Sequence, residues 1–132
     1  MIYLDTAALV KLVRREVESD ALVDWIASRP DELLVSSALA EVELPRALRR
    51  TEPALLPAVP GVLGRIAIYE IDELVRSTAA AYDGAAIRSL DAIHLATADA
   101  VLADDLTAFV TYDRRLLAAA DDLGLPVAAP AP

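Results

Sequence analysis

The sequence predicts an α/β protein, an α/β/α sandwich in which helices cover both faces of a central parallel sheet of about four to five strands. Short apolar runs such as "MIYL" and "AFVTY" alternate along the chain with segments whose apolar residues have helical spacing. Parallel strands need such crossover helices between them. The length of 132 residues fits a single domain over 1–132.

The first half of the chain is expected to alternate strand and helix. Short apolar runs predict strands at 1–4 and 32–37. Apolar residues at helical spacing predict helices at 6–16, 19–28 and 38–50. Pro45 falls inside the last of these helices and is expected to kink it or to mark its first turn.

The second half begins with a segment, 51–64, that carries three prolines and two glycines, which predicts a broken helix or a loop. The elements expected after it are a strand at 65–71, helices at 72–86 and 89–103, a strand at 106–112, a helix at 113–124 and a short edge strand at 125–130.

The composition restricts the kinds of site that the chain can carry. It has no cysteine and a single histidine, so a metal site must use oxygen ligands with at most one imidazole, which favours a hard cation such as Mg²⁺ or Mn²⁺. No apolar run approaches the roughly 18 residues that span a membrane. The start of the chain lacks the order of a signal peptide, so we expect a cytoplasmic protein.

The net charge of −9 on its own argues against nucleic-acid binding. However, eleven of the twelve cationic side chains are arginines, whose planar guanidinium groups match phosphate geometry. Several of them cluster, as Arg46 with Arg49 and Arg50, and as Arg114 with Arg115. About half of such arginines are expected simply to be solvated.

Three aspartates fall at the ends of predicted elements. Asp5 and Asp113 directly follow predicted strands, and Asp91 lies in the first turn of a helix that is otherwise apolar all round. Carboxyl ends of parallel strands meet at one edge of a sheet, and carboxylates that converge there need a cation between them. Helix caps and turn residues are the alternative interpretation.

A fourth acid is offered by the helix at 38–50, where Glu41 and Glu43 flank the apolar arc on opposite sides; periodicity does not choose between them. His94 lies three residues after Asp91, in position to pair with it, although a lone histidine in an apolar helix is more often a core residue. The sequence contains no GxSxG, Walker or HExxH motif, which disfavours serine hydrolysis and nucleotide binding.

Four segments together resemble the successive motifs of the PIN-domain family, in particular the VapC toxins: "YLDTAALVKL", "SSALAEVELPRALRR", "SLDAIHLATA" and "FVTYDRRLLAAADDLGLPV". The resemblance runs through nearly the whole chain in order. It implies a catalytic and metal-binding set of four acids, Asp5, Glu43, Asp91 and Asp113. Thr6 and Thr111 match positions where the family often has small hydroxyl residues near the metal.

The resemblance also implies an Mg²⁺-dependent endoribonuclease (Mn²⁺ is possible), a homodimer, and a VapB-type antitoxin that docks on the toxin and forms a larger assembly with it. The RNA would be a tRNA, rRNA or mRNA. We further hypothesise that the RNA backbone is gripped by some of the clustered arginines, Arg46, Arg49, Arg50, Arg114 and Arg115. Trp25 would suit a partner groove or the core equally well.

Two other functions are weighed against this one. A PIN-like module that binds RNA or a partner without cutting would show binding insensitive to Mg²⁺. An Mg²⁺-dependent phosphatase with Asp5 as nucleophile would need a second aspartate two residues later, and that position is Ala7, which argues against it.

Overall fold

The computed structural model describes residues 1–84 and 86–132. Its centre is a five-stranded sheet in the order β3-β2-β1-β4-β5. The strands are β1 (Ile2–Leu4), β2 (Leu34–Ser37), β3 (Ala67–Tyr69), β4 (Ala108–Val110) and β5 (Val127–Ala128). Every neighbouring pair is parallel, so the predicted parallel sheet is confirmed.

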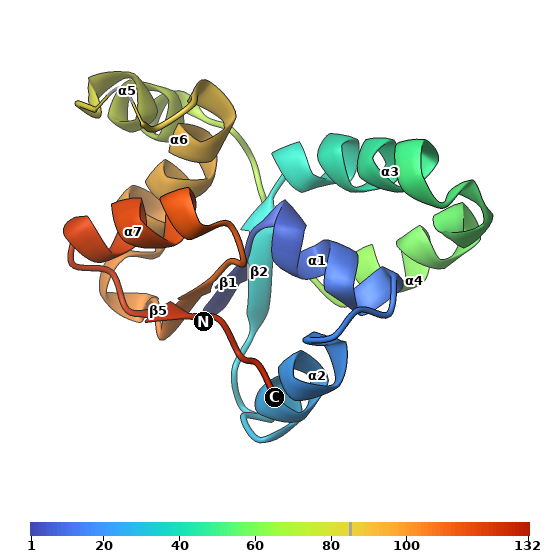
Figure 1. The fold of residues 1–132 in the computed structure, drawn as a ribbon. Coiled ribbons are helices and arrows are strands. Elements are labelled where there is room, and N and C mark those ends of the chain that lie inside the picture. Colours follow the sequence, from blue (N-terminus) through green and yellow to red (C-terminus); the bar gives the residue numbers. More distant parts are fainter. Residues whose placement is uncertain (85) are drawn as a thin grey trace.

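Helices cover both faces of the sheet (Figure 1). One layer holds α1 (Thr6–Val13), α2 (Ser19–Ala27), α3 (Leu39–Thr51) and α4 (Val59–Leu63). The other holds α5 (Glu73–Ala81), α6 (Ser89–Ala96) and α7 (Arg114–Asp122). The predicted α/β/α sandwich is therefore the observed architecture.

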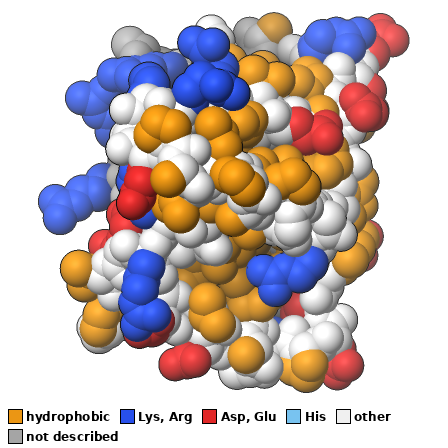
Figure 2. Space-filling model, turned by 90° about the vertical axis from the view of Figure 1, so that its right-hand side faces the viewer, with side chains coloured by type: hydrophobic (Ala, Val, Ile, Leu, Met, Phe, Trp, Pro, Cys, Tyr) orange, Lys and Arg blue, Asp and Glu red, His pale blue; other side chains and the backbone are white. Residues whose placement is uncertain are grey.

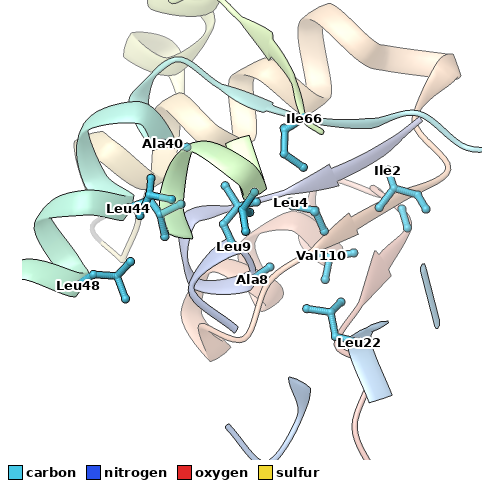
Figure 3. Close-up of a cluster of buried hydrophobic side chains, with 13 residues drawn as sticks. Ile2, Leu4, Ala8, Leu9, Leu22, Ala40, Leu44, Leu48, Ile66 and Val110 are labelled. Atoms are coloured by element: carbon cyan, nitrogen blue, oxygen red, sulfur yellow. The ribbon is translucent and has the colours of Figure 1, made fainter. Parts of the chain in front are cut away.

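Strand β1 supplies side chains to both layers, because successive residues of a strand point to opposite faces. Leu4 packs against Leu9 of α1 and Leu44 of α3 in one core cluster (Figure 3). Tyr3, the residue before Leu4, joins Phe109 in the second cluster, under α6 and α7. Burying each such side chain contributes about 1.5–3 kcal/mol, so this central strand is held firmly from both sides.

Two predicted helices differ in detail from the structure. Pro45 lies in the interior of α3, not in its first turn. The helix expected over 89–103 is α-helical only to Ala96 and continues as a π-helix, Thr97–Leu102. The Thr97 hydroxyl donates to the carbonyl of Ile93, 2.8 Å away, and such side-chain bonds compete with the regular helical ladder.

The proline-rich segment forms a broken helix, as predicted: a 3₁₀ stretch, Pro53–Ala58, runs into α4. Figure 2 shows the face on the side of α3 and α4, where hydrophobic side chains cover much of the surface and Lys and Arg side chains gather at one corner. Within residues 1–84 and 86–132, no helix has the length and apolar character needed to cross a membrane.

Candidate functional site

Asp5 lies at the carboxyl end of β1 and is almost fully buried, with 3% of its surface exposed. It caps helix α1, because its Oδ1 accepts from the Ala8 N–H at 2.9 Å. Its Oδ2 accepts from the Thr111 hydroxyl. Burial raises the pKa of Asp5 to about 6, against the opposing effects of His94 and Thr111.

Asp113 follows β4, which pairs with β1, so the two aspartates lie at the same edge of the sheet. Asp113 caps α7 through bonds from the N–H groups of Arg115 (2.9 Å) and Leu116 (3.3 Å). Thr111 connects the two acids, since its hydroxyl also accepts from the Asp113 N–H at 3.1 Å. The capping interpretation is thus correct for both aspartates, and it leaves Asp113 exposed at the site.

Asp91 is half-buried in the first turn of α6. Burial raises the pKa of Asp91, and the nearby charges of Asp113 and Glu43 raise it further. The charge of Asp113 also raises the pKa of Asp5. The four predicted acids therefore share one electrostatic environment, although they come from four separate parts of the chain.

Glu43 is the glutamate of α3 that faces this environment, whereas Glu41 is exposed. Its Oε1 accepts from the Thr6 hydroxyl at 2.6 Å and from His94 Nε2 at 2.8 Å. Burial acts to raise the pKa of Glu43, but the hydrogen bonds from His94 and Thr6 outweigh it and hold the pKa below its usual value. Of the two glutamates that periodicity left open, Glu43 is therefore the one that lies beside the other acids.

His94 is buried, as expected of a core histidine, with 3% of its surface exposed. The expected pairing with Asp91 is not what its hydrogen bonds show: Nε2 bonds to Glu43, and Nδ1 bonds to the Tyr3 hydroxyl at 2.6 Å. Sequence reasoning missed both partners. They lie 91 and 51 residues away, and helical spacing reports only neighbours on the same helix.

The donor set at this edge consists of carboxylate oxygens, which suit a hard divalent ion. In the described part of the chain, no three acidic or histidine side chains already stand close enough to share one ion. Asp91 is partly exposed and Asp113 is exposed, and the capping bonds of Asp113 occupy only its Oδ1. The carboxylates are neighbours at one edge, and the residues fit such an ion by their chemistry.

The predicted arginines lie in three different surroundings. Arg46 and Arg50 line a hollow of about 330 Å³ together with Glu43, between α3 and the start of α6. Arg115 instead lines an apolar hollow of about 560 Å³ along α7. Arg49 and Arg114 are exposed on α3 and α7. Trp25 is partly buried against the core of the α1 layer and is covered by the guanidinium of Arg29.

The model of the PIN domain family matches residues 2–122. Ribonuclease VapC35 of Mycobacterium tuberculosis is 60% identical over 131 residues, which cover 98% of this chain and 97% of that protein. Ribonucleases VapC46 and VapC47 of the same organism are 43% and 40% identical, with 98% of this chain and 97% of each relative covered.

Two solved structures share the fold. The crystal structure of FitAcB from Neisseria gonorrhoeae matches with a TM-score of 0.69 and 23% identity, over 96% of each chain. A structure of FitAB bound to an IR36 DNA fragment matches with a TM-score of 0.65 and 21% identity, over 98% of this chain and 95% of the other.

Proposed function

This chain belongs to the PIN domain family and is of the VapC type, and on that basis we propose that it is an endoribonuclease that depends on Mg²⁺ or Mn²⁺. The support for the proposal is that Asp113 raises the pKa of Asp5, and Asp113 and Glu43 raise that of Asp91, in a chain 60% identical to a named ribonuclease. In this proposal the four acids are the catalytic and metal-binding set.

Each acid has a distinct part in this proposal. Asp5 and Asp91 would be the main ligands of the ion, and Asp113 and Glu43 would complete the set directly or through water. A bound divalent ion supplies positive charge, which lowers the pKa of a water and stabilises charge on a phosphate. Thr111 keeps Asp5 in place by its hydrogen bond, and Thr6 does the same for Glu43.

The RNA backbone is the proposed ligand of the arginines. Arg46 and Arg50 stand on the wall of the hollow that includes Glu43, so they would offer phosphates a cationic contact beside an acidic site. Arg49 and Arg114, exposed on the neighbouring helices, would extend that contact. Replacing either Arg49 or Arg114 by alanine should weaken RNA affinity and make the slope of log affinity against log salt concentration shallower by about one. Unchanged affinity and slope in both variants would contradict this role.

A protein partner is also part of the proposal. The VapC name of the relatives and the FitAB complex among similar structures support a VapB-type antitoxin for this chain. Val42 and Leu90 stand 58% and 49% exposed on the hollow that holds Glu43, and a docked antitoxin segment would cover them and obstruct the site. A homodimer that joins a larger assembly with the antitoxin completes this picture.

The experiment is cleavage of a tRNA pool and an rRNA fragment by protein free of antitoxin, with Mg²⁺ or with EDTA. Glu43→Gln is compared with Glu41→Gln, the matched change two residues away on the exposed side of α3. We expect cleavage that needs Mg²⁺, survives in Glu41→Gln and is lost in Glu43→Gln. Folded wild-type protein that cuts no RNA at any Mg²⁺ or Mn²⁺ concentration would favour a module that binds without cutting.

A further inference from the structure

A buried chain of hydrogen bonds leads from the central strand to the edge of the site. The Tyr3 hydroxyl lies 2.6 Å from His94 Nδ1, and His94 Nε2 lies 2.8 Å from Glu43 Oε1. Tyr3 and His94 are 0% and 3% exposed. The chain thus joins β1, α6 and α3 by side chains that water does not reach from the Tyr3 end.

The direction of these bonds follows from what each group can donate. A carboxylate only accepts, so Nε2 must carry the proton that faces Glu43. A hydroxyl carries one proton that it can donate, and Nδ1, which lies 2.6 Å from the Tyr3 hydroxyl, is the ring nitrogen left to accept it. The imidazole is therefore held as the Nε2–H tautomer by its partners on both sides.

Tyr3 is itself a rigid anchor for the ring. It lies in β1 between two paired strands, and its ring stacks on Phe109 at 5.2 Å with an angle of 4° between the planes. The imidazole meets the Tyr3 ring edge-on, with the ring centres 5.8 Å apart. The position of His94 is thus fixed relative to β1, the strand that Asp5 follows.

Glu43 is held by one of its two oxygens. Oε1 accepts both from His94 and from Thr6, while in residues 1–84 and 86–132 the structure shows no hydrogen bond to Oε2. A carboxylate pinned at one oxygen by two donors presents the other in a fixed direction. Outer hydrogen bonds of this kind orient metal ligands in proteins and tune their affinity.

We propose that His94 is a positioning residue: it is held by Tyr3, it binds Oε1 of Glu43, and it would so leave Oε2 available to the ion directly or through water. This inference rests on the proposed function, since it concerns how Glu43 serves that same site. His94 itself touches neither RNA nor metal in this account. Its contribution is to keep Glu43 from turning away when the other acids gather around a cation.

Two substitutions test the hydrogen bonds at the two imidazole nitrogens separately. In His94→Gln the amide nitrogen occupies the position of Nε2, so it donates to Glu43 but no longer reaches Tyr3. In His94→Asn the amide oxygen occupies the position of Nδ1, so it accepts from Tyr3 but no longer reaches Glu43. Each variant loses one buried hydrogen bond, so we expect similar falls in the midpoint of thermal unfolding in EDTA.

Mg²⁺ affinity, measured by calorimetry on the folded proteins, should differ between them. We expect His94→Asn to bind Mg²⁺ at least about tenfold more weakly than wild type, and His94→Gln to stay within a few-fold of it. The Mg²⁺ concentration that gives half-maximal cleavage should rise in the same order. Equal losses of affinity in both variants would overturn the positioning role and reduce His94 to a packing residue.

A spectroscopic measurement tests the geometry without using activity. Because the chain has a single histidine, the ¹⁵N spectrum of its imidazole belongs to His94 without further assignment. We expect a protonated Nε2 in metal-free protein, and an unprotonated Nε2 would overturn the inference. Wild-type protein that binds neither Mg²⁺ nor Mn²⁺ would instead overturn the proposed function and this inference with it.

Discussion

The ionised carboxylate of Asp5 should destabilise the metal-free fold. Asp5 is 3% exposed, and burial raises its pKa from 3.8 to about 6. At about 1.4 kcal/mol for each pH unit, this difference amounts to roughly 3 kcal/mol at pH 7.5. The folded state binds the proton more tightly between these values, so the free energy of unfolding must fall as the pH rises through this window and level off above it.

The substitution Asp5→Asn removes that charge and can keep one hydrogen bond at each end of the side chain, with the direction of the Thr111 bond reversed. Its amide oxygen can accept from the Ala8 N–H, and its NH₂ group can donate to the Thr111 hydroxyl. In EDTA at pH 7.5 we therefore expect Asp5→Asn to be more stable than wild type by about 2–3 kcal/mol. Roughly half of that difference should disappear by pH 5, where the wild-type carboxyl is mostly protonated in the fold.

The assay is urea unfolding in EDTA at several pH values, with Asp24→Asn as the control because Asp24 is an exposed carboxylate of α2. The difference between wild type and Asp5→Asn isolates Asp5 from Asp91, whose pKa is also raised by burial, and from Glu43, whose pKa is lowered. If Asp5→Asn were no more stable than wild type at pH 7.5, the reasoning about buried charge would be refuted.

Further changes test the surroundings of the acids. Saturating Mg²⁺ at about 100 times its dissociation constant should stabilise wild type by about 2.7 kcal/mol in thermal unfolding, and a shift as large in Asp5→Asn would speak against Asp5 as a ligand. Thr111→Val should lower the free energy of unfolding by about 1–3 kcal/mol and reduce cleavage more than tenfold, because Asp5 loses a donor; unaltered cleavage would contradict this. Leu44→Ala, in the core beside α1, should cost about 2–5 kcal/mol in urea unfolding, and a loss below 1 kcal/mol would show that α3 is not anchored there.

The strands and helices were predictable because each depends on the pattern of apolar residues within one short segment of the sequence. The apolar run before Asp5 and the one before Asp113 correspond to β1 and β4, and their parallel pairing places both acids at one edge. The sequence could indicate these positions because strand ends and helix starts are properties of short segments.

The rest of the site depends on contacts between distant segments. Glu41 and Glu43 flank the apolar arc on opposite sides of a helical wheel, and only the contacts of α3 with α6 and α1 distinguish them. The Tyr3 partner of His94 could not be found from spacing either, because it comes from β1, 91 residues away in the sequence, on the face of the sheet that α6 covers. The π-helix after Ala96 is likewise a local departure from the α-helical ladder that apolar periodicity does not mark.

The central claim is that the acids at this sheet edge share one divalent ion. The most direct measurement is an anomalous difference map from crystals of the wild-type chain grown with Mn²⁺. We predict a single strong peak bound by Asp5 and Asp91, with Asp113 and Glu43 completing the set directly or through water. Protein that cuts RNA in Mn²⁺ but shows no ion among these carboxylates, or an ion bound elsewhere, would contradict the account.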